Sequence, residues 1–216
     1  METVIAHPVM KGGRAKRLVL ALAVFVLFYC AVMLGQASSK MKSAGGSTVA
    51  TVTKYCAGVE AFEKAHDHEG RLFANIGTAE NSTDEWREVP NKKELDKLEH
   101  DDEALVWFQD GNLVAANIAF SSGSGDWVNS ANYCFRADHT LARIHSVLNT
   151  FEGGVHLVRE SIYDSNGSVV RSSSQLFDLE TKKPIKGEHS FMDVPTPVFL
   201  KTADLPFFSV LQRKKR

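Results

Sequence analysis

Residues 103–120 read EALVWFQDGNLVAANIAF, which is two apolar runs joined by the dipeptide Asp110-Gly111. Asp-Gly between apolar runs is a strong hairpin signal, because a type I′ turn needs positive φ at both central residues. A turn this short joins only antiparallel neighbours, since parallel strands need a long crossover connection. The stretch therefore predicts an antiparallel hairpin, and it sets the pattern for the residues that follow.

The same pattern continues toward the C-terminus, where strand-like runs of about ten residues alternate with turn signals. The further turn signals are Gly123-Ser124-Gly125, Asp138-His139, Gly153-Gly154, Asn166-Gly167 and Lys182-Lys183-Pro184. A shorter hairpin is predicted upstream, from residues 71–77 and 83–89. We predict an α+β domain whose sheet is an antiparallel up-and-down meander of about 6–8 strands, curled into a half-barrel.

Two amphipathic patterns predict how the sheet is covered. Residues 48–66 place Val52, Tyr55, Cys56, Val59 and Phe62 on one stripe of a helix, which we expect to fill the hollow of the sheet. In the strand WVNSANYCF, alternation gathers aromatic groups on one face, which we expect to be core. These aromatic residues are Trp127, Tyr133 and Phe135.

The last stretch, residues 192–211, holds three of the six prolines. Proline lacks the donor that a sheet ladder needs, so we predict an edge strand or an extended wrap there. Its large apolar side chains are expected to fasten it to the core. They are Phe199, Leu205, Phe207 and Phe208.

The amino terminus predicts the compartment. Residues 18–35 read LVLALAVFVLFYCAVMLG without a charge, and four basic residues precede this run. A run of this length is near the roughly 20 apolar residues that span a bilayer, and the more basic flank is expected to stay in the cytoplasm. Two alternatives remain: a single-pass anchor over residues 18–37, or a signal peptide cleaved after Ala37, which would release a secreted protein.

This topology predicts four segments. Residues 1–17 form a cytoplasmic basic segment, 18–37 the membrane segment, 38–47 a linker, and 48–216 an exported domain in the periplasm or outside the cell. From residue 38 on, the chain carries 21 positive and 25 negative side chains. A mildly acidic domain disfavours nucleic acid as a partner. The expected partners are the membrane, through residues 18–37, and either an apolar ligand or an envelope protein.

Cys56 and Cys134 are the only two cysteines of the expected exported part. An oxidising compartment favours their pairing, which would join the predicted helix to a central strand. The alternative is two separate buried thiols, because Cys56 also fits the apolar stripe of the helix. The sequence leaves both states open.

Histidines supply the weak candidates for chemistry. His66 and His68 alternate with acidic residues at the predicted helix end, but their spacing matches no zinc pattern, so no metal is expected. His145, His156 and Glu160 are candidate catalytic residues, since neighbouring strands can gather ionisable groups on one sheet face. The alternative is the ordinary hydrated face of an antiparallel sheet.

No motif in the sequence names a reaction. The chain contains no HExxH, Walker-type loop, GxGxxG or GxSxG, and no cofactor is expected. A meander with a helix in its hollow is similar in outline to exported half-barrels that hold apolar ligands. We therefore expect a membrane-tethered, non-enzymatic domain that binds an apolar ligand or an envelope partner. The alternative is a small hydrolase or isomerase that uses the polar sheet face.

Overall fold

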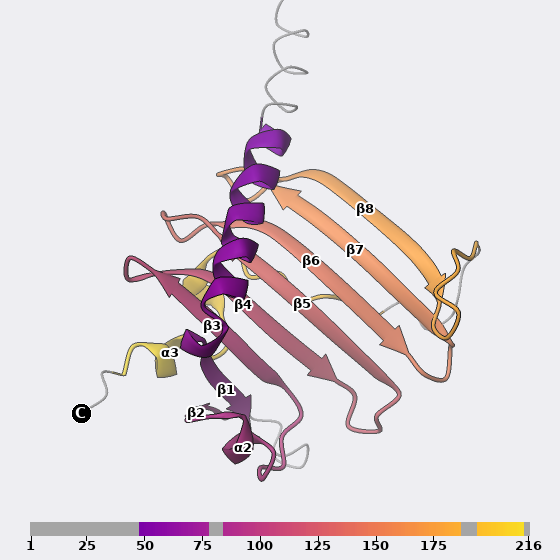
Figure 1. Cartoon of the computed structure of the whole chain (residues 1–216), viewed down its shortest axis with the longest axis horizontal. Coiled ribbons are helices and arrows are strands. Elements are labelled where there is room, and N and C mark those ends of the chain that lie inside the picture. Colours follow the sequence, from indigo (N-terminus) through magenta and orange to yellow (C-terminus); the bar gives the residue numbers. More distant parts are fainter. Residues whose placement is uncertain (1–47, 78–83, 187–193, 214–216) are drawn as a thin grey trace, which may run out of the picture. The chain divides into compact units, whose positions relative to one another are not determined.

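A computed structural model describes residues 48–77, 84–186 and 194–213 of the chain. Its centre is one antiparallel sheet with the order β2-β1-β3-β4-β5-β6-β7-β8, which stays open and does not close into a barrel (Figure 1). The strands are β1 (Arg71–Asn75), β2 (Trp86–Val89), β3 (Glu103–Gln109), β4 (Asn112–Ser121), β5 (Trp127–Phe135), β6 (Leu141–Thr150), β7 (Val155–Tyr163) and β8 (Val169–Asp178). The antiparallel α+β meander is thus confirmed.

Besides the sheet, the described residues form one longer helix and several short helical elements. The longer helix covers residues 48–65 and is followed by the 3₁₀ turn η1 (Asp67–Glu69). The remaining elements are α2 (Lys92–Leu95), η2 (Thr202–Asp204) and α3 (Phe208–Leu211). The side chain of Asn91 accepts a hydrogen bond from the backbone N–H of Glu94 and so caps α2.

The strands β3 to β8 follow one another as neighbours because their connections are short. Asp110 and Gly111 both have positive φ, of 51° and 80°, as a type I′ turn between β3 and β4 requires. The predicted early hairpin also forms, since β1 pairs antiparallel with β2. At that end the order departs from a simple meander, because β1 lies between β2 and β3.

One face of the sheet carries the large aromatic core. Tyr133 and Phe135 are fully buried in a cluster that also holds Phe73 and Ile118. Residues 194–207 cover this face of the sheet. We call this segment the strap and the face that it covers the strap face. The Phe207 ring stacks on Phe73 with the ring centroids 5.0 Å apart. The C-terminal stretch is therefore an extended wrap fastened by its aromatic residues.

The strap also makes polar contacts with the strands beneath it. The Tyr133 hydroxyl donates to the backbone carbonyl of Pro197 at 2.9 Å, and the Thr196 hydroxyl donates to Ser146 at 3.0 Å. Lys201 forms an isolated antiparallel bridge with Thr140. Proline-rich backbone is thus held by side chains rather than by a regular ladder, which is what a segment short of N–H donors needs.

The helix of residues 48–65 packs on the opposite face, which we call the helix face (Figure 1). Its buried residues Val52, Cys56 and Val59 contact a second cluster that includes Ala115 and Cys134. The expectation that this helix packs on the sheet with Val52 and Val59 is therefore confirmed, and it does so on the face opposite the aromatic core. The strap occupies the aromatic face, and small residues on the other face let the helix approach.

Three β-bulges lie under the helix. The register shifts between Trp107 and Phe108, between Cys134 and Phe135, and between Ile162 and Tyr163. The first residue of each pair belongs to the helix-face cluster and the second to the strap-face core or its border. At each shift the partner strand carries one extra residue, and all three belong to the helix-face cluster or pack against it: Val114, Ala142 and Val170.

The predicted membrane segment, residues 18–37, and the linker, residues 38–47, lie outside the described residues. Within the described ranges, no helix combines the length and the apolar character that a membrane crossing requires. The membrane anchor and the direction of export therefore remain predictions from the sequence.

Candidate binding surface on the helix face

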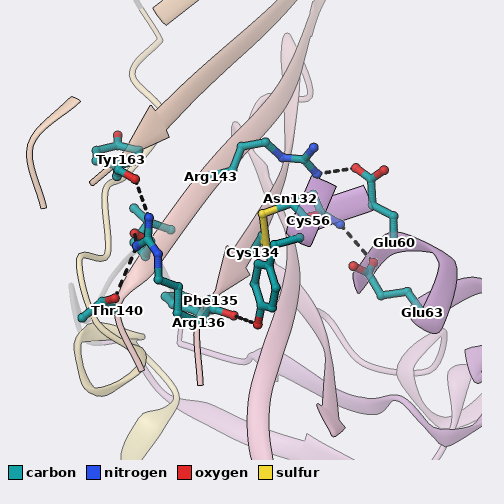
Figure 2. The surroundings of a disulfide bond; sticks show 12 residues. Cys56, Glu60, Glu63, Asn132, Cys134, Phe135, Arg136, Thr140, Arg143 and Tyr163 are labelled. Carbon is teal, nitrogen blue, oxygen red and sulfur yellow. Dashed lines mark hydrogen bonds and ion pairs between the residues drawn. A yellow bond between two sulfur atoms is a disulfide. The ribbon is translucent and has the colours of Figure 1, made fainter. Parts of the chain in front are cut away.

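The helix is joined to the sheet by a covalent bond. The sulfurs of Cys56 and Cys134 are bonded, and the two Cα atoms lie 5.9 Å apart (Figure 2). Both residues are completely buried or nearly so. A disulfide that closes a loop of 78 residues limits how far the helix can move from the sheet.

Two acidic side chains of the helix extend from the disulfide along the same side. Cys56, Glu60 and Glu63 follow the spacing of a single helical stripe, and both carboxylates point toward the sheet (Figure 2). Arg143 of β6 donates to Glu60 and forms an ion pair with it. The Arg143 side chain is 7% exposed and that of Glu60 is 41% exposed, so the pair lies at the border of the buried region.

Glu63 meets a neutral partner instead. The Asn132 side-chain amide donates to Oε2 of Glu63 at 3.1 Å. The other carboxylate oxygen, Oε1, and the Asn132 oxygen Oδ1 are both enclosed and have no donor among the described residues. Burial raises the pKa of the Glu63 carboxyl, and nearby Glu60 adds to this, whereas Asn132, Arg143 and Lys64 act in the opposite direction.

A polar groove of about 390 Å³ runs between the helix and the strands at this point. Its wall includes His145 of β6, one of the candidate catalytic residues from the sequence. Eight residues line it, and three of them come from the helix. They are Glu60, Glu63, Lys64, Asn117, Ser130, Asn132, His145 and Val147.

The structure brings two of the three candidate catalytic residues together. His145 and Glu160 are direct cross-strand neighbours, and Arg171 Nη2 lies 3.4 Å from Glu160 Oε1. His156 pairs with Asn149 instead, with His156 Nδ1 2.7 Å from Asn149 Oδ1. Burial lowers the pKa of His156, and so does Lys182. His156 is four residues along β7 from Glu160, too far to share a reacting group with it.

Beyond the helix, side chains of β5 to β8 form three cross-strand rows, which we call the open face. The first row is Asn132, His145, Glu160 and Ser173; the second is Ser130, Val147, Val158 and Gln175; the third is Val128, Asn149, His156 and Phe177. None of the twelve is fully buried. Residues on the other side of the same strands, such as Ala131 and Leu148, are at most 1% exposed. The open face is therefore the accessible side of a rigid sheet.

The composition of the open face is unusual for a protein surface. Glu160 is the only Asp, Glu, Lys or Arg among its twelve residues, whereas these types make up 24% of the chain. Val147 and Val158 pair at its centre, with polar residues around them. Depletion of charge around an apolar centre, with a polar rim, is the composition of protein–protein interfaces.

The two histidines at the end of the helix do not form a metal site. His66 Nδ1 lies 2.9 Å from the backbone carbonyl of Phe62, and its ring stacks on the Phe62 ring. His68 is exposed and lies 3.7 Å from Glu69. No group of three or more metal-ligating side chains occurs within the residues that the structure describes.

A second hollow lies under the strap. It has a volume of about 320 Å³ between the strap and strands β6 and β7. Its wall mixes the apolar residues Ile144 and Val198 with polar ones such as Ser146, Ser161 and Arg159. The Arg159 guanidinium donates to the backbone carbonyl of Val194 at 2.9 Å, so this side chain helps to hold the strap.

Arg136 is a polar residue that sequence reasoning did not single out. Its guanidinium donates to the carbonyls of Leu141 and Tyr163 and to the Thr140 hydroxyl (Figure 2). It thereby joins the turn between β5 and β6 to the end of β7. The acidic pair Glu60 and Glu63 was also missed, although both lie at helical spacing from Cys56, at i+4 and i+7, and so continue the apolar stripe.

The chain shows no detectable similarity to a protein-family model, a curated protein or a solved structure.

Proposed function

We propose that the chain is a non-enzymatic, membrane-tethered domain that binds an envelope protein through the open face. The single observation that carries the proposal is the charge-depleted array of three cross-strand rows around Val147 and Val158. A sheet face offers a broad, rigid surface, and such surfaces suit a protein partner better than a small molecule, which prefers a concave site.

The proposed location supports the same conclusion. The disulfide between Cys56 and Cys134 is the kind of bond that persists in an oxidising compartment, which the basic flank and apolar run at residues 11–37 also predict. A domain anchored by residues 18–37 is confined to the layer beside the membrane. Confinement raises the effective concentration of a membrane-bound partner, so a modest contact area is sufficient for association.

The test is site-specific photo-crosslinking of the full chain in its native membranes. A photoreactive residue in place of Val158 should give one discrete adduct, because Val158 is central in the open face. The matched control is a photoreactive residue at Val198, which is 52% exposed but belongs to the strap. The partner identified from the adduct, once purified, should bind Val158→Lys at least tenfold more weakly than the parent chain.

Two results would contradict the proposal. One is a set of adducts that is the same at Val158 and Val198. The other is a purified partner whose affinity does not change in Val158→Lys while the variant keeps the parent's unfolding temperature. A reporter fused after Arg216 tests the export step separately, because it should be active only if it functions outside the cytoplasm.

A catalytic role is the second candidate, and the polar groove favours it specifically. The groove places Glu63, with its raised pKa, on the same wall as His145, and a general acid and base need such proximity. A hydrolase or isomerase of this kind would lose turnover in both Glu63→Gln and His145→Ala. If the domain binds an apolar ligand instead of a protein, the hollow under the strap is the site for it. Polar residues make up about half of that wall, so we favour the protein partner.

A further inference from the structure

The contact between Glu63 and Asn132 contains one of the two hydrogen bonds that join a carboxylic acid to an amide in a paired arrangement. The Asn132 N–H donates to one carboxylate oxygen, while Glu63 Oε1 and Asn132 Oδ1 are enclosed acceptors without a donor. An enclosed acceptor without a donor destabilises the fold, because the hydrogen bond it made to water is not replaced. A proton on Glu63 Oε1 would turn this acceptor into a donor, and a carboxylic O–H that donates to Asn132 Oδ1 would satisfy both atoms.

We infer that Glu63 is a protonation switch at the border between the helix and the open face. As a neutral acid it completes a two-bond pair with Asn132 and holds the end of the helix on the sheet. As a carboxylate it places a charge beside the amide oxygen and loosens that contact. Asn132 is a member of the first row of the open face, so the switch adjusts one side of the proposed binding surface.

Charged and titratable groups from the helix and from β6 surround Glu63. The helix contributes Glu60 and Lys64, and β6 contributes Arg143 and His145. Arg143 is engaged by Glu60 in the ion pair described above, which reduces its ability to stabilise a second carboxylate. The partner on β5, Asn132, is neutral. The surroundings thus offer Glu63 little net positive charge, which agrees with the raised pKa.

The sign of the pH dependence follows from linkage. The folded domain holds the Glu63 proton more tightly than the unfolded chain, so its contribution to stability is complete below the ordinary carboxyl range. That contribution is lost as the pH rises through the folded-state pKa. The binding consequence depends on the proposed function of the open face, but the protonation itself does not.

The experiment compares thermal unfolding of the full chain at pH 5 and pH 8. Glu63→Gln carries an N–H and a carbonyl where the neutral acid carries its O–H and carbonyl, so it reproduces the protonated pair at every pH. It should unfold at a temperature about 2–4 °C above the parent chain at pH 8, with a smaller difference at pH 5. Glu152→Gln, at an exposed turn, is the control and should match the parent at both pH values.

A second variant tests the role of the amide. Asn132→Asp replaces the neutral partner by a carboxylate, so its unfolding temperature should fall more steeply between pH 5 and pH 8 than that of the parent. The inference is overturned if Glu63→Gln unfolds at or below the parent temperature at pH 8, or if it keeps the parent's pH dependence. No partner takes part in these measurements, so failure of the switch and failure of the proposed function are distinguished.

Discussion

The two faces of the sheet are covered in different ways, although the same strands build both. The strap face is closed by the chain's own C-terminal residues, and its aromatic side chains, such as Tyr133 and Phe135, are fully buried. The helix face is closed only along the line of the helix and the disulfide, and the twelve residues of the open face stay accessible. We therefore expect the first face to contribute most of the stability, and we propose that the second face binds the partner.

The largest expected effect tests the strap face. Phe135→Ala should lower the free energy of unfolding by about 3–5 kcal/mol, because it removes a fully buried aromatic ring from the core. His145→Ala, on the half-buried open face, should change it by only about 0.5 kcal/mol. Denaturant melts of the full chain measure both variants. If His145→Ala were the costlier change, the assignment of the two faces would be inverted.

The disulfide is the next test, since it fastens the helix to the helix face. Replacing Cys56 and Cys134 by Ser should destabilise the folded chain by roughly 4 kcal/mol in the chain-entropy model for a closed loop of this length. Thiol counting on the denatured full chain without reductant should find only the thiol of Cys30. Three free thiols after purification from the oxidising compartment would show that packing alone holds the helix in place.

Arg143 and Arg171 on the helix face differ in burial, so replacing them should change the free energy of unfolding by different amounts. Arg143→Met should cost about 1–3 kcal/mol, because it removes a buried charge-assisted hydrogen bond to Glu60. The cost stays below that of breaking a fully buried pair, since Glu60 can regain water. Arg171→Met is the matched control; its side chain is 51% exposed and the change should stay within about 0.5 kcal/mol. Equal costs in urea melts would mean that the helix border is no more buried than the open face.

The strands and turns could be predicted from the sequence because both are encoded locally. Asp110-Gly111 and Asn166-Gly167 lie where the chain reverses, and alternation correctly placed Tyr133 and Phe135 in the core. The cover of each face could not be predicted. Two segments were apolar enough to fill the hollow, the helix and the strap, and local periodicity does not choose between them.

The candidate site depended on long-range register, which alternation does not supply. Between β5 and β6 the bulge makes Ala142 an extra residue, so Ala142 and Arg143 both face the helix, which strict alternation does not predict. Glu60 and Arg143 are 83 residues apart in the sequence, and nothing near either residue indicates the other. His145 and Glu160 were selected as ionisable residues on neighbouring strands, but their pairing became visible only in the register.

The most direct test of the proposed division between the faces uses two adjacent residues of β8. Ser172 and Ser173 are both exposed, and their side chains point to opposite faces of the sheet, Ser173 to the open face. Thiol labelling of Ser172→Cys and Ser173→Cys should proceed at similar rates in the purified chain. In native membranes, labelling at Ser173→Cys should slow about tenfold or more while Ser172→Cys stays unchanged, because a bound partner covers the open face alone. Unchanged labelling at Ser173→Cys, or protection confined to Ser172→Cys, would contradict the account.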